Sequence, residues 1–184
     1  MEKTKIKAHS AVLIANVIFG LGVPVTKLLL DDWVSPMAYM ASRFIGATII
    51  FWLVSLFLPR EHVYPKDLLV IMAGGLLGFV ISLTLSAWAL NYTTPVYFSF
   101  IASLTPVATM ALAALFIGEK LSGRGVFGVI IGIVGTMLMV LMGWQGGSGS
   151  NDLLGIVLAL LSMLTWAGYL IITRSVSTKY SAVT

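Results

Sequence analysis

Residues 126–140 read VFGVIIGIVGTMLMV, a run in which every side chain is apolar or small except Thr136. A strand of a membrane β-barrel would alternate apolar and polar side chains over about 10 positions, and this run has no such alternation. The apolar run that begins at residue 126 extends to residue 144. Similar runs occupy residues 11–30, 36–58, 68–90, 96–117 and 153–173. An α-helix needs about 20 residues to cross the ~30 Å hydrocarbon core of a bilayer. The sequence therefore predicts six transmembrane helices.

The composition also indicates that the chain lies in a lipid bilayer rather than in water. Of 184 residues, 59% are hydrophobic and 10% are charged, against about 25% charged in an average soluble domain. A soluble domain of this length buries only about 70% of its unfolded surface, so it could not hide this much apolar area from water. A helix in lipid satisfies its own backbone hydrogen bonds. We therefore expect an all-α, polytopic transmembrane helix bundle whose partner is the lipid bilayer.

The basic residues occupy alternate connections between the predicted spans. They precede the first span and follow the second, fourth and sixth spans, as Lys3, Lys5, Lys7, Arg60, Lys66, Lys120, Arg124, Arg174 and Lys179. The connections at 31–35, 91–95 and 145–152 contain neither lysine nor arginine. Cytoplasmic loops carry an excess of these residues, so both termini are predicted to be cytoplasmic. We expect a plasma membrane location, specifically the bacterial inner membrane.

The scattered basic residues form no patch of the kind that binds nucleic acid, so we expect no nucleic-acid partner. A cleaved signal peptide is the alternative for residues 1–30, because a basic start precedes an apolar run. That run is longer than a typical signal-peptide apolar region and no small-x-small cleavage site follows it. It also ends in Lys27 and Asp31. These features favour a retained first helix.

A polar tract, QGGSGSND, occupies residues 145–152 and has the composition of a flexible linker. We expect residues 1–144 to form a first five-helix repeat and residues 153–184 to hold the first helix of a second repeat. The first helix of each expected repeat aligns weakly in sequence with the other, so that Phe19-Gly20 corresponds to Trp166-Ala167 and Thr26 corresponds to Thr173. A five-helix unit begins and ends on opposite sides of the membrane. A second copy is therefore inverted, as in many secondary transporters.

Prolines and glycines inside the spans predict local bends and close packing. Pro24 and Pro106 each remove a helical hydrogen bond, so we expect kinks in the first and fourth spans. Gly74 and Gly78 have the small-x-x-x-small spacing that lets helix backbones approach closely in lipid.

Several motifs lie in matching order along the chain. They are Phe19-Gly20 with Thr26-Lys27, Ser42-Arg43-Phe44-Ile45-Gly46-Ala47, Trp88-Ala89-Leu90-Asn91-Tyr92-Thr93-Thr94, Ser103-Leu104-Thr105-Pro106-Val107, and Leu115-Phe116-Ile117-Gly118-Glu119-Lys120-Leu121. With these motifs the chain resembles the drug/metabolite transporter superfamily, in particular its EamA-like permeases. The resemblance implies ten helices in two repeats of five, and a secondary permease or exporter for small organic metabolites such as amino acids or drugs.

Because six spans are predicted here and such permeases have ten, the resemblance also implies a truncated inverted-repeat fold. Two other functions remain open at this point. The chain could be a non-transporting membrane scaffold or interaction module, or a half-size transporter that acts as a homodimer.

The sequence supplies few groups for catalysis. It has no cysteine, its histidines are His9 and His62 at the predicted cytoplasmic edge, and no Asp or Glu lies midway along a span. Acid–base, nucleophilic and metal chemistry all need such groups. We therefore predict no catalytic residue, no metal site, no cofactor and no enzymatic activity.

Lys27 and Arg43 are the basic residues inside the predicted spans. Such a residue costs about 2.5–3.5 kcal/mol at a helix centre and usually marks a site or a pathway. Lys27 is close to the end of its span and can extend to the interface beside Asp31 and Asp32. Arg43 lies about 10 Å along its helix and should face the bundle. There it either ties helices together or attracts the anionic part of a substrate.

Polar stripes on several spans extend this candidate site. Asn16 and Lys27 share one helix face, and Ser82 and Ser86 share another. We expect a polar cavity with aromatic walls to bind a small-molecule substrate, lined by Asn16, Lys27, Arg43, Ser82, Ser86, Ser99, Ser103, Trp166 and Tyr169. Hydrogen bonding between helices is the alternative role of the polar members.

Overall fold

The structure, a computed structural model, describes residues 2–57, 62–118, 123–143 and 149–180. These residues form helices joined by short connections, without a β-strand in the described ranges. The helices are α1 (Glu2–Asp32), α2 (Pro36–Ser55), α3 (Pro65–Gly75), the π-helix η1 (Leu76–Ser82), α4 (Leu83–Tyr92), α5 (Pro95–Ser103), α6 (Thr105–Ile117), α7 (Gly123–Gly143), α8 (Asp152–Ile172) and α9 (Arg174–Ser177).

The helices match the predicted spans closely. Five stretches are long and apolar enough to cross a bilayer, namely Val12–Asp32, Pro36–Ser55, Pro65–Tyr92, Pro95–Ile117 and Asp152–Ile172. The remaining predicted span corresponds to α7, in which the described part holds the shorter apolar stretch Gly125–Gly135. Large apolar side chains cover the outside, with Phe51, Trp52 and Phe116 exposed by 71%, 66% and 73%. The predicted polytopic helix bundle is confirmed.

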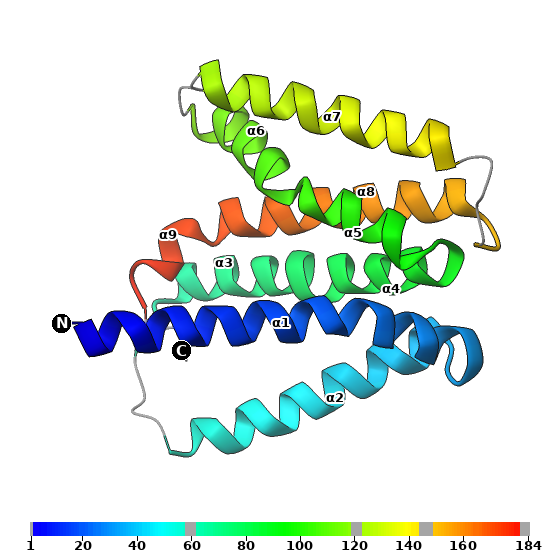
Figure 1. Ribbon diagram of the computed structural model, residues 1–184. Helices are drawn as coiled ribbons and strands as arrows, with labels where there is room; N and C mark the ends of the chain where they lie inside the picture. The colour runs from blue at the N-terminus through cyan, green and yellow to red at the C-terminus, as the bar shows by residue number, and fades with distance from the viewer. Residues whose placement is uncertain (1, 58–61, 119–122, 144–148, 181–184) are drawn as a thin grey trace.

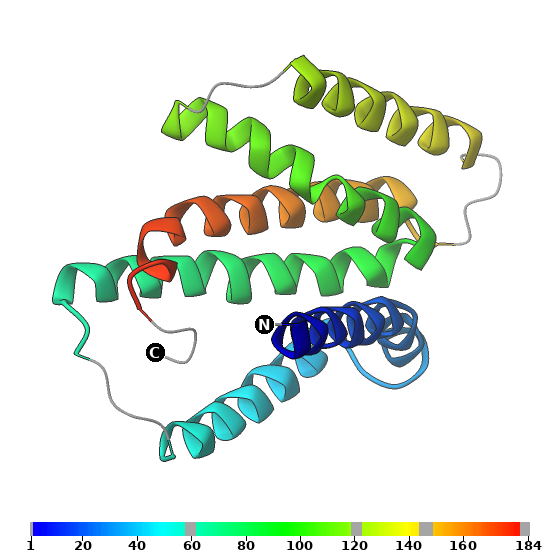
Figure 2. The same cartoon turned by 60° about the vertical axis from the view of Figure 1, so that its left-hand side comes forward.

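Helix α8 occupies the middle of the bundle (Figures 1 and 2). It packs against η1, α4, α5 and α6. On the other side of the α3–η1–α4 rod, α1 contacts α4 and α5, and α2 contacts α4. On the same side of the rod as α8, α7 lies outermost and contacts α5 and α6. The helix that the sequence assigns to a second repeat thus supplies much of the packing surface for the helices before the linker.

Glycines allow this close packing. A Cβ added at Gly78 would overlap the ring of Tyr169, and one added at Gly74 would overlap the Thr173 side chain. The aromatic ring therefore lies directly on the rod's backbone. The predicted role of these two glycines in helix packing is confirmed.

The two prolines behave differently. Helix α1 continues through Pro24, whereas the fourth predicted span is divided at Leu104 into α5 and α6, just before Pro106. Pro106 has no N–H for the carbonyl of Ala102, four residues earlier. The Thr105 hydroxyl donates to that carbonyl instead, at 2.6 Å. The predicted interruption at Pro106 is confirmed, and its unpaired carbonyl has a local partner.

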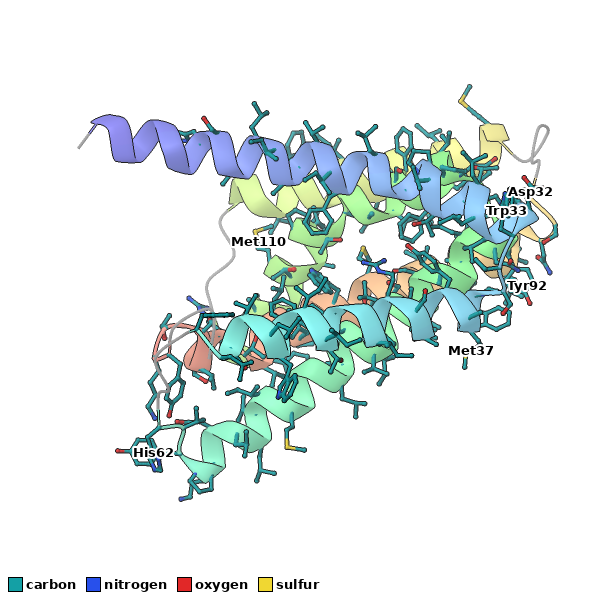
Figure 3. All side chains as sticks on the ribbon, turned by 90° about the horizontal axis from the view of Figure 1, so that it is seen from below. Asp32, Trp33, Met37, His62, Tyr92 and Met110 are labelled. Atoms are coloured by element: carbon teal, nitrogen blue, oxygen red, sulfur yellow. The ribbon has the colours of Figure 1, made fainter. Side chains whose placement is uncertain are left out.

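Polar contacts tie α8 and its continuation to the rod at both ends. Near its start, the buried Thr93 hydroxyl donates to Asp152 Oδ1 at 2.6 Å. Near its end, Lys179 Nζ and the Tyr180 hydroxyl donate to Asp67 Oδ2 at 2.5 and 2.7 Å. Figure 3 shows both ends of the bundle, with Asp32, Trp33 and Tyr92 at one end and His62 at the other.

Candidate functional site

Three cavities follow one another through the bundle. The first, called the α1–α2 cavity, has a volume of about 320 Å³ and is lined by Ile18, Phe19, Gly22, Val23, Thr26, Tyr39, Met40, Arg43, Leu83, Ser86, Ala87, Leu90 and Phe98. The central cavity, of about 210 Å³, is lined by Phe19, Ser82, Leu83, Ser86, Phe98, Ala102, Thr105, Ala159, Ser162, Met163 and Trp166. The α6–α8 cavity, of about 570 Å³, is lined by Thr105, Pro106, Thr109, Met110, Ala113, Ile117, Leu170, Ile171 and Arg174.

The cavities share walls. Phe19, Leu83, Ser86 and Phe98 line both the α1–α2 cavity and the central cavity. Thr105, at the break between α5 and α6, lines both the central cavity and the α6–α8 cavity. Each of these cavities therefore borders at least one side chain that also lines a neighbouring cavity.

A chain of polar groups connects α1 and α2 at the α1–α2 cavity. Arg43 Nη1 donates to the Tyr39 hydroxyl at 3.2 Å, and that hydroxyl is 2.7 Å from Thr26 Oγ1. Because an arginine only donates, the phenol oxygen accepts from Arg43 and its proton is available to Thr26. The guanidinium carbon is also 5.6 Å from the centroid of the Tyr39 ring, a cation–π arrangement. Tyr39 thus fixes the position of the arginine.

The two intramembrane cations differ in their partners. Lys27 forms an ion pair with Asp31 one turn later, at 2.8 Å, and lines none of the three cavities. This contact agrees with the predicted extension of Lys27 toward the helix end. Arg43 does line a cavity, and no carboxylate in the described ranges pairs with it. The arginine is therefore the stronger candidate for contact with a solute.

The predicted serines of the third span form a cluster with Ser162 of α8. Ser82 Oγ donates to the Ser162 carbonyl and Ser162 Oγ donates to the Ser82 carbonyl, both at 2.9 Å. The hydroxyls of Ser86 and Ser162 are 2.6 Å apart. Ser82 and Ser162 are 2% and 5% exposed. These bonds join α8 to the rod, while Ser86 also borders two cavities.

The two predicted aromatic site residues have different positions, one in a cavity wall and the other in the contact between α8 and the rod. Trp166 lines the central cavity and contacts Phe79 edge-on, with ring centroids 5.8 Å apart. Tyr169 also contacts Phe79, at 5.4 Å, but its ring covers Gly78 and lines none of the three cavities. Tyr169 therefore packs α8 on the rod, whereas Trp166 forms part of the wall of the central cavity.

Besides Lys27 and Tyr169, three more predicted site residues lie apart from these cavities. Asn16, Ser99 and Ser103 are exposed. The Asn16 amide donates to the Val12 carbonyl at 2.8 Å, and Ser103 Oγ donates to the Phe100 carbonyl at 2.6 Å. Both bonds stay within one helix. A contact of these three residues with a solute remains a prediction.

Sequence reasoning missed Tyr39, Thr26 and Ser162. Tyr39 precedes Arg43 by four residues and Ser162 precedes Trp166 by four, so each shares a helix face with a residue that was chosen. The signal for both is a polar side chain one helical turn before a predicted site residue. Within the described ranges, no group of three or more His, Cys, Asp or Glu residues could hold a metal ion. Arg60, Glu119 and Lys120 of the predicted connections lie outside the described residues.

Comparisons with known proteins give a consistent assignment. A WAT1-related protein of Arabidopsis thaliana is 29% identical over 180 residues, which cover 86% of this chain and 46% of that protein. The uncharacterized transporters YvbV and YetK of Bacillus subtilis are 27% and 24% identical, over 88% and 100% of this chain and 52% and 56% of their own lengths. The chain thus spans about half the length of these relatives. No solved structure gives a significant match. The sequence profile of the EamA-like transporter family matches residues 6–141, and this chain therefore belongs to that family.

Proposed function

We propose that this chain forms part of a secondary permease or exporter, rather than an enzyme, and that it contributes a path for small organic metabolites such as amino acids or drugs. The observation that carries the proposal is the row of three cavities that share walls. The α1–α2 and α6–α8 cavities have volumes within the ~300–1,000 Å³ range of small-molecule sites. The transporter names of several relatives support the same activity.

The helix break at Leu104 suits a moving part of this path. Thr105 lies at the wall between the central and α6–α8 cavities, and Pro106 keeps α5 and α6 from forming one continuous helix. Broken helices beside a binding site are common in secondary transporters, and a few residues at an element's end can act as a hinge. We propose that rotation about Leu104 opens and closes the connection between these cavities.

We further propose that residues 1–144 are the first of two inverted repeats, with 145–152 as the linker and 153–184 as the start of the second repeat. The placement of α9 and the beginning of α1 at the same end of the bundle supports a shared side for both termini (Figure 1). The charge distribution favours the cytoplasm for that side, in a plasma membrane such as the bacterial inner membrane.

Transport is tested by reconstituting the purified chain in liposomes and measuring uptake of radiolabelled leucine, radiolabelled aspartate and ethidium. Chemical cross-linking in the same vesicles counts the subunits. Uptake by cross-linked dimers assigns transport to a half-size homodimer. Uptake that requires an extended chain, translated from further downstream coding sequence, assigns it to two repeats in one protein. If neither form transports any compound above empty liposomes, the proposal is wrong and a scaffold function is favoured.

The path is tested in whichever form transports. Ser86→Leu adds a bulky side chain where the α1–α2 and central cavities meet, so we expect uptake to fall by about tenfold or more. Ser55→Leu is the matched control, because Ser55 is exposed near the end of α2 and bonds the Trp52 carbonyl of its own helix. Equal uptake by the two variants, at equal expression and helical content, would exclude this wall from the path.

A further inference from the structure

We propose that the α1–α2 cavity binds small organic monoanions that combine a carboxylate with an apolar body, and that it discriminates against organic cations of the same size. The inference rests on the proposed function, because it names the substrate class of the same path. It depends on three features of the cavity, which are its single fixed cation, its apolar remainder and its size.

The charge of the site comes from Arg43. Its guanidinium is held by the Tyr39 hydroxyl at 3.2 Å and by the Tyr39 ring, and neither contact neutralises the positive charge. Within the described residues no carboxylate pairs with it, while the neighbouring cation Lys27 is already paired with Asp31. An arginine has five N–H donors in a planar fork, and two of them suffice to bind both oxygens of a carboxylate. An anion would thus supply the missing partner.

The positioning of Arg43 is set before any ligand arrives. The Tyr39 phenol accepts from Arg43 and is 2.7 Å from Thr26 Oγ1, so groups on α1 and α2 fix the arginine together. A side chain fixed in advance loses less conformational freedom on binding.

The rest of the cavity is apolar and small. Phe19, Met40, Leu90 and Phe98 are among its walls, and its volume is about 320 Å³. This volume is at the lower end of the ~300–1,000 Å³ typical of small-molecule sites, which favours metabolites over larger drugs. A dianion would leave its second charge against apolar side chains, at a large desolvation cost. An organic cation would meet the guanidinium directly, and like charges repel.

The ligand series phenylacetate, phenylacetamide and phenethylammonium tests the inference on the unmodified chain. The three compounds share one aromatic body and differ in charge. Binding is measured by equilibrium dialysis of the purified 184-residue chain in detergent micelles, with empty micelles subtracted for partitioning. We expect phenylacetate to bind at least about tenfold more tightly than the other two, a difference of about 1.4 kcal/mol. Equal binding of the three, or preference for the cation, would overturn the inference.

Variants identify the residue responsible. Arg43→Gln should remove the preference for phenylacetate, whereas Arg43→Lys should retain part of it, because a lysine keeps the charge and loses the planar fork. Lys66→Gln removes the same charge from an exposed position at the start of α3, outside the cavities, and should leave the preference unchanged. A preference that survives in Arg43→Gln would also overturn the inference.

Further outcomes distinguish this inference from a lipid-headgroup site and from the proposed transport function. Displacement of phenylacetate by phosphatidylglycerol added to the micelles would show that the cavity accepts a lipid headgroup, and would refute a metabolite site. Selective binding of phenylacetate without uptake of any compound in liposomes would support the inference and refute the proposed transport. Uptake without anion selectivity would refute the inference alone.

Discussion

The serine cluster between α8 and the rod allows a quantitative prediction about what holds the bundle together. The Ser162 hydroxyl donates to the Ser82 carbonyl at 2.9 Å and is 2.6 Å and 3.2 Å from the hydroxyls of Ser86 and Ser82. In Ser162→Ala these contacts are lost, while Ser82 Oγ still donates to the Ser162 carbonyl. Interhelical hydrogen bonds in membranes contribute on average about 0.6 kcal/mol and at most about 1.7 kcal/mol. We therefore expect Ser162→Ala to lower the free energy of unfolding by about 1–2 kcal/mol.

The assay is equilibrium unfolding in mixed micelles with increasing sodium dodecyl sulfate, followed by tryptophan fluorescence. Trp166 lies one turn from Ser162 and reports on the same contact surface. A double-mutant cycle of Ser86→Ala and Ser162→Ala isolates their mutual bond. Because the two oxygens are only 2.6 Å apart, we expect a coupling free energy of about 0.6–1.7 kcal/mol.

Ser55→Ala is the control for this cycle, since its hydroxyl bonds a carbonyl of its own helix at 2.7 Å. We expect it to change the unfolding free energy by less than about 0.5 kcal/mol. A coupling between Ser86 and Ser162 below about 0.3 kcal/mol would mean that the two sites act independently. In that case the bond between Ser86 and Ser162 would not contribute to the association of α8 with the rod.

Two other predictions concern packing and pH. Gly78→Ala should lower the unfolding free energy by about 1–3 kcal/mol, because the added Cβ overlaps the Tyr169 ring. In Gly75→Ala the added Cβ meets no atom within 4 Å, so this variant should raise the unfolding free energy by about 0.5–1 kcal/mol in the same assay. Similar effects at both positions would contradict the packing of Tyr169 on Gly78. The hydrogen bond with Asp67 raises the pKa of Lys179 above its ordinary 10.5, so the stabilisation that Lys179 supplies should be complete below pH 10.5 and should disappear as the pH rises through the raised value. The difference in unfolding free energy between the unmodified chain and Lys179→Met should therefore shrink as the pH rises from 10.5 through the raised pKa of Lys179. A difference that grows with pH would contradict the contact between Lys179 and Asp67.

Part of the candidate site was accessible from the sequence because charge and polarity are conspicuous in an apolar span. This criterion selects Arg43, Ser82 and Ser86, and all three line cavities. The same criterion could not separate them from Ser99, which is exposed outside those cavities. Polarity identifies a residue that needs a partner, but the partner depends on how each helix is rotated about its axis. That rotation is set by packing between helices.

The sequence alone determined the medium, the helical state and the approximate spans, because the cost of exposing a backbone or a charge to lipid acts on each segment separately. The missing N–H of a proline predicted kinks at both Pro24 and Pro106, and the structure divides only the fourth span, at Leu104. Only the tertiary structure decided that α8 lies at the centre of the bundle, that Ser162 joins it to the rod, and that Tyr39 holds Arg43 beside a cavity. These arrangements follow from side chains far apart in the chain fitting together, as Tyr169 does on Gly78, and no single segment contains that information.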